Sequence, residues 1–189
     1  MFLSAGNIRP DRWLLDDVKQ VSERDYREFS KRIIPEIDDV LYTKGGTTGV
    51  AKVVDLTERF QVWVHIAVLK LDKVKVNPNY LAYALNSAKC YEQSQLFTRG
   101  ATNKDLGLTR MINIVLPRPN LEEQMHIVVY LDEISAEFLR LNDLVVGEIQ
   151  RLEEYMSVLV SNSVTGKIKI PEPPLTPTLS PRGVCFKHT

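Results

Sequence analysis

A long proline-free segment with a regular apolar repeat constrains the fold of this chain most strongly. It follows the stretch LPRPNLEEQ, which begins at Leu116, and no further proline occurs before Pro171. Apolar residues recur there at alternating spacings of four and three, with one gap at Glu148. They are Ile127, Leu131, Ile134, Phe138, Leu141, Val145, Leu152, Tyr155 and Leu159. A 3.5-residue repeat sustained over about five heptads predicts a coiled-coil helix ~60 Å long.

The start of this helix carries its own sequence signals. Asn120 is a favourable N-cap, and Glu123, three positions later, can complete a capping box. The apolar stripe can be buried on the chain's own globular part or against another helix. Because the predicted helix is longer than a domain of about 120 residues is wide, we expect much of it to meet another helix.

The residues before the two prolines show a mixed pattern of strands, turns and one clear helix start. Residues 38–54 predict a strand, a glycine-rich turn and a second strand, and residues 60–71, FQVWVHIAVLKL, predict an inner strand. A helix is expected to begin at Asn77-Pro78. Residues 97–102 predict a turn, and residues 112–116 predict a final strand that ends before the prolines.

These patterns predict an α+β fold with three parts. A mixed α/β domain covers residues 1–117, a long coiled-coil helix covers residues 118–168, and a proline-rich tail covers residues 169–189. The tail composition predicts a disordered or extended segment, with a ligand for SH3-like domains as the alternative.

The formal net charge is zero, but the charges are unevenly distributed. Residues 40–118 hold eleven Lys or Arg and five Asp or Glu, whereas residues 121–160 hold nine acidic and two basic residues. A basic segment followed by an acidic helix favours two different partners, and the alternative is two ordinary solvated surfaces. The apolar runs are far below the ~20 residues that span a bilayer, and no secretory signal is visible. We therefore expect a cytoplasmic protein without a membrane partner.

Two loops carry residue types suited to contacting phosphates or base edges. The first loop contains glycine amides, hydroxyls and a lysine. The second loop contains glycine with basic and amide groups. The candidate residues are Lys44, Gly45, Gly46, Thr47, Thr48, Arg99, Thr102, Asn103 and Lys104. Either loop can instead be an ordinary solvated turn. The first is not a Walker loop, because its lysine precedes the glycines and no helix pattern follows directly.

No set of residues points to catalysis, a metal or a cofactor. His65 lies in a predicted strand and is expected to serve packing, because no carboxylate, Ser or Cys is placed to complete a triad. His126 and His188 suggest no ligand geometry. Cys90 and Cys185 lie in unrelated contexts, so they form neither a disulfide framework nor a metal-ligand set.

The long helix and its flanks resemble the DNA specificity subunit of type I restriction-modification systems. The matching residues are LPRPNLEEQMHIVVYLDEI at the helix start and VTGKI, from Val164, at its close, where the family has "PLPPLEEQ" and "LISxxVTGKID"-like patterns. Upstream, FLSAGNI from Phe2, DVLYT from Asp39 and the GGTTG loop resemble a target recognition domain. The resemblance covers Phe2 to about Ile170.

This resemblance implies a non-catalytic subunit that recognises double-stranded DNA. Its helix would form a coiled coil and hold the methylation subunit and, through it, the restriction subunit, which carry the methyltransferase and endonuclease activities. Family members typically have two recognition domains, each followed by such a helix. This chain has one of each, and the opening strands of its recognition domain are expected to be missing.

Several alternatives remain open at the level of the sequence. Truncated members of the family can pair as homodimers through the long helix, which gives two identical half-sites. The chain can also be a fragment of a broken gene. A coiled-coil interaction protein that binds the methylation subunit without recognising DNA is the second function considered. A phosphate-handling enzyme at the glycine loop lacks any acid, base or metal set.

Overall fold

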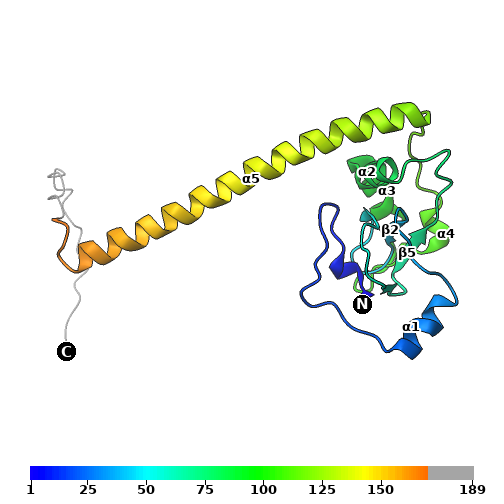
Figure 1. The fold of residues 1–189 in the computed structure, drawn as a ribbon, viewed down its shortest axis with the longest axis horizontal. Coiled ribbons are helices and arrows are strands. Elements are labelled where there is room, and N and C mark those ends of the chain that lie inside the picture. The colour runs from blue at the N-terminus through cyan, green and yellow to red at the C-terminus, as the bar shows by residue number, and fades with distance from the viewer. Residues whose placement is uncertain (170–189) are drawn as a thin grey trace, which may run out of the picture. The chain divides into compact units, whose positions relative to one another are not determined.

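A computed structural model describes residues 1–169 (Figure 1). The architecture is α+β with a long C-terminal helix, as predicted, and it divides into two compact units. The first unit is Met1–Ser135, and the second begins at Ala136. The expectations for the proline-rich tail, Cys185 and His188 lie outside the described residues.

A three-stranded antiparallel sheet lies at the centre of the first unit. Its strands are β2 (Val40–Thr43), β3 (Ala51–Val53) and β5 (Ile66–Leu69), in the order β3-β2-β5. The strand, turn and strand predicted for residues 38–54 are therefore confirmed. Every residue of β2 is buried, and its side chains alternate between two apolar clusters on the opposite faces of the sheet.

The apolar segment at residues 60–71 does not form the predicted inner strand. It forms β4 (Gln61–Val62), a turn at residues 63–65, and β5, which lies at an edge of the sheet and pairs with β2. The chain reverses because the Ile66 N–H donates to the Trp63 carbonyl at 2.9 Å. β4 pairs in parallel with β1 (Phe2–Leu3). The sequence did not indicate this turn, because the apolar run contains neither glycine nor proline.

Two consecutive helices pack on one side of the sheet. They are α2 (Pro78–Asn86) and α3 (Ala88–Phe97). Asn77 caps α2 as expected, with its side chain accepting from the Tyr80 N–H at 3.1 Å. The remaining helices of this unit, which the sequence patterns did not indicate, are the 3-10 helix η1 (Ala5–Asn7), α1 (Glu23–Ser30) and α4 (Leu108–Met111).

Residues 112–116 do not form the predicted final strand. Ile114 lies in the core, but Ile112, which ends α4 in a helical conformation, and Val115 are each about three quarters exposed. The side chain of Gln93 takes the place of a partner strand: its Oε1 accepts from the Val115 N–H, and its Nε2 donates to the Val115 carbonyl, both at 2.8 Å. These bonds give the Val115 N–H and carbonyl hydrogen-bond partners without a neighbouring strand.

The long helix α5 (Leu121–Val164) confirms the helix predicted after the two prolines. Asn120 caps it, because the Asn120 Oδ1 accepts from the Glu123 N–H at 2.9 Å. Within residues 1–169 the reciprocal bond, in which the Glu123 carboxylate would accept from the Asn120 N–H, is not formed. The predicted capping box is therefore half complete.

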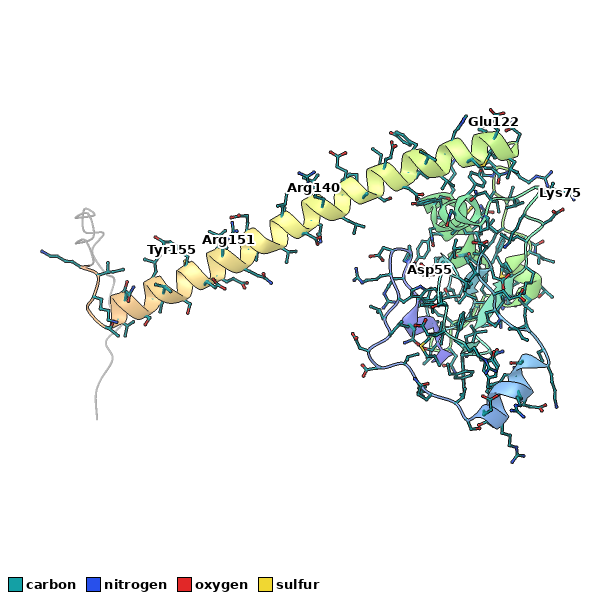
Figure 2. All side chains as sticks on the ribbon, viewed as in Figure 1. Asp55, Lys75, Glu122, Arg140, Arg151 and Tyr155 are labelled. Atoms are coloured by element: carbon teal, nitrogen blue, oxygen red, sulfur yellow. The ribbon has the colours of Figure 1, made fainter. Side chains whose placement is uncertain are left out.

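The first turns of α5 belong to the first compact unit and are held there by a buried amide. Gln124 is fully buried; its Oε1 accepts from the Asn77 N–H at 2.8 Å, and its Nε2 donates to the carbonyls of Lys75 and Pro119 at 3.1 and 2.8 Å. The Tyr83 hydroxyl donates to Asp132 at 2.6 Å. Lys75 and Glu122 are labelled at this junction in Figure 2.

Candidate nucleic-acid interface

The two loops singled out from the sequence lie side by side in the structure. The Gly46 N–H donates to the Lys104 carbonyl at 2.9 Å, and the Leu106 N–H donates to the Lys44 carbonyl at 2.7 Å. Gly45 and Asp105 form an antiparallel bridge between these bonds. Sequence reasoning identified each loop, but no pattern indicated that they are neighbours.

The second loop is a closed hairpin whose tip projects into solvent. Arg99 and Asp105 exchange backbone bonds of 2.9 and 2.8 Å, which close the loop at its base. Gly100 has a φ of 94°, and a Cβ there would lie 2.3 Å from the Asn103 carbonyl oxygen, so the tip requires glycine. This arrangement exposes the side chains between the two closing residues.

Most of the predicted site residues are accessible, and two are not. Exposed on the surface are Gly46, Thr47, Arg99, Thr102, Asn103 and Lys104, while Lys44 is half-buried. Gly45 and Thr48 are buried. The Thr48 hydroxyl accepts from the Thr98 hydroxyl at 3.0 Å and from the Gln95 amide at 3.3 Å. Thr48 therefore fastens the first loop to the end of α3.

The cations of the two loops have no acidic partner among the described residues. Among residues 1–169, no ion pair includes Lys44, Arg99 or Lys104. Other cations of this unit are paired: Lys70 contacts Glu36 at 2.6 Å, and its hydrogen bond and charge lower the pKa of that carboxyl. Arg110 contacts Asp105 at 2.8 Å. The loop cations are thus available to an external anion.

A third segment reaches the same surface, namely the turn at Trp63, Val64 and His65. The Lys44 N–H donates to the His65 carbonyl at 2.7 Å, and a Cβ on Gly45 would lie 2.1 Å from the His65 Nδ1. The sequence placed His65 within a strand and assigned it to packing. It lies instead in the turn that interrupts that strand, where it is exposed and its ring packs against Gly45.

An apolar hollow of about 490 Å³ lies beside this turn. Trp63 and Val64 line it together with Lys44 and Arg32, and the remaining lining residues are apolar apart from Gln61. The lining includes no Asp, Glu, His, Ser or Cys that could act as an acid, base or nucleophile. Within residues 1–169, no cluster of three or more His, Cys, Asp or Glu could hold a metal ion.

The apolar repeat along α5 is largely open to solvent. Figure 2 shows the side chains along this helix, with Arg140, Arg151 and Tyr155 labelled. The members of the predicted seam that are at least half exposed are Phe138, Leu141, Val145, Leu152 and Tyr155, whereas Ile127, Leu131, Ile134 and Leu159 are half-buried. No helix in the described part of the chain has the length and apolar character needed to cross a membrane.

Comparison with known proteins agrees with this architecture. The crystal structure of a type I restriction-modification system S subunit from M. genitalium is similar, with a TM-score of 0.50 and 21% sequence identity. The match covers 67% of this chain and 33% of that chain, so the present chain spans about a third of the S subunit's length. No curated protein matches. A family model for the type I restriction modification DNA specificity domain matches residues 9–153, and the protein therefore belongs to this family.

Proposed function

We propose that the chain is a DNA-binding specificity subunit that directs the methylation and cleavage activities of partner subunits. Its DNA-binding surface would be the pair of loops at Lys44–Thr47 and Arg99–Lys104. One observation carries this proposal: backbone hydrogen bonds join two loops that are distant in sequence, and the joined loops present three cations that have no acidic partner within residues 1–169. Such a surface suits the phosphates of a nucleic-acid duplex.

The side chains of the two loops divide into two roles. Lys44, Arg99 and Lys104 would contact phosphates, which sets the register of the protein on DNA without reading sequence. The exposed Thr47, Thr102 and Asn103 can donate to and accept from base edges. Gly45 and Thr48, which are buried, would support the loops without touching DNA.

The long helix would supply the protein partner. A stripe of exposed apolar residues such as Phe138 and Leu152, 68% and 61% exposed, is unfavourable in water and favours burial against another helix. We propose that this helix binds the methylation subunit and, through it, the restriction subunit. Pairing with a second copy of the chain would place two identical recognition domains on two half-sites.

Alanine variants of the loop cations test the DNA-binding proposal. The full chain and its Lys44→Ala, Arg99→Ala and Lys104→Ala variants would be titrated with random-sequence duplex DNA at several salt concentrations. We expect each variant to bind more weakly, with a log–log salt slope shallower by about one unit for each lost phosphate contact. Lys89→Ala is the matched control, because this exposed cation lies at the opposite end of α3 from the second loop.

A second function remains to be separated from the first. The exposed apolar face of α5 also suits a protein that binds the methylation subunit without recognising DNA. In that case the wild-type chain has no DNA affinity for the loop variants to lose. Capture of a type I methylation subunit by the chain, with no DNA retained by the resulting complex, would support this second function and overturn the first.

A further inference from the structure

The turn at Trp63, Val64 and His65 joins the loop surface, but the sequence patterns had not associated it with binding. Trp63 and Val64 are 47% and 52% exposed, and His65 is exposed as well. Surface turns usually carry small polar residues or glycine, whereas this one carries a tryptophan and a valine. The Trp63 ring packs against Phe2, whereas Val64 belongs to neither apolar cluster of the described residues.

This turn is closed by an internal hydrogen bond and is held by β1 on one side and by the first loop on the other. The Trp63 N–H donates to the Leu3 carbonyl at 2.8 Å, and the Ile66 N–H donates to the Trp63 carbonyl at 2.9 Å. The Trp63 ring packs edge-on against Phe2, with 5.5 Å between the ring centroids. On the other side, the His65 carbonyl accepts from the Lys44 N–H. The turn therefore presents its side chains in a fixed position next to the first loop.

We propose that this turn reads base edges in the major groove beside the polar side chains of the neighbouring loops, while the loop cations contact phosphates. The inference rests on the proposed DNA binding and adds sequence-reading residues to the same surface. The imidazole of His65 has ring nitrogens that can donate to the N7 or O6 of guanine, and Val64 offers an apolar contact for the methyl group of thymine. That methyl group lies in the major groove.

The base-edge contacts proposed for Val64 and His65 should affect DNA binding differently from the phosphate contacts of the loop cations. A base-edge contact changes the preference among sequences, whereas a phosphate contact changes affinity for all sequences about equally. Loss of Val64 should therefore leave the salt slope unchanged, because this side chain carries no charge that displaces counterions. Specificity and salt dependence can be separated in one set of titrations.

The test is a selection from a random duplex library by the full chain and by its Val64→Ala, His65→Ala and His65→Gln variants. Affinities are then measured for the selected duplex and for duplexes with single base-pair substitutions. We expect His65→Ala and Val64→Ala each to reduce the discrimination at one base pair roughly tenfold. His65→Gln retains a donor and an acceptor, so it should keep part of the discrimination. Matched controls are His126→Ala and Val74→Ala, at exposed positions outside this surface.

The outcomes separate this inference from the proposed function. If Val64→Ala and both His65 variants keep the wild-type preference while the loop-cation variants lose affinity, the inference is wrong and DNA binding stands. If the wild-type chain binds no DNA, both are overturned. Thermal unfolding of each variant identifies a folding defect, and if His65→Ala does not fold, the outcomes for His65→Gln and Val64→Ala decide.

Discussion

At the scale of single residues, Gly45 is the point where the first loop and the turn at residues 63–65 constrain each other. A Cβ at this position would lie 2.1 Å from the His65 Nδ1 and 2.5 Å from its Cγ. We expect Gly45→Ala to displace the imidazole and to lower the free energy of unfolding by about 1–3 kcal/mol, as overpacking typically does. Urea unfolding followed by tryptophan fluorescence measures this, because Trp13 and Trp63 both lie in the first unit.

A second glycine provides the matched control for this substitution. Gly147 lies inside α5, where an added Cβ would have no neighbour within 4 Å. Gly147→Ala should stabilise the helix by about 0.5–1 kcal/mol, because alanine loses less backbone entropy than glycine. Circular dichroism at 222 nm reports this change. Equal effects of the two substitutions on the first unit would contradict the close contact at Gly45.

At the scale of elements, the junction between α2 and α5 includes the buried side chain of Gln124. Gln124 makes three hydrogen bonds, to Asn77, Lys75 and Pro119. We expect Gln124→Ala to cost about 2–4 kcal/mol of unfolding free energy, because it leaves buried backbone groups without partners and creates a cavity. Chemical denaturation of the full chain measures the loss. Gln150→Ala, at an exposed position on the same helix, should change stability by less than about 0.5 kcal/mol.

The elements also differ in how far the sequence could predict them. The start of α5 was predictable, because a cap, two prolines and a sustained repeat agree within a few residues. The strand at residues 112–116 was not, because the backbone of Val115 pairs with Gln93, a side chain from α3, and not with another strand. The split of residues 60–71 was also hidden, since the turn there contains no glycine or proline.

The two loops of the candidate site were predictable from the sequence, but their proximity in the fold was not. Lys44 and Arg99 stand out by residue type and by nearby glycines, whereas their proximity arises from backbone pairing between Gly46 and Lys104, which leaves no trace in side-chain pattern. The burial of Thr48 likewise depends on Thr98 and Gln95. Long-range pairing of this kind is a property of the folded chain.

At the scale of the whole molecule, the proposed pairing of long helices and the proposed DNA surface make a joint prediction. A chain that associates through the apolar stripe of α5 would carry two loop surfaces, and a duplex with two selected half-sites would be bound through both. The second contact then forms within one complex, so affinity should exceed that for a single half-site by about 100-fold or more when the spacing fits.

Leu141→Asp tests this joint prediction, because it places a charge in the centre of the predicted seam, where Leu141 is 50% exposed. We expect this variant to shift the chain to monomers in sedimentation equilibrium and to reduce its affinity for the double site to that for a single half-site. Its affinity for the single site should be unchanged, because the loops at Lys44 and Arg99 lie on other elements. Asn142→Asp adds the same charge one position off the stripe and should change neither property. An unchanged association state in Leu141→Asp would mean that the stripe is not the seam and that the apolar face of α5 serves a different protein.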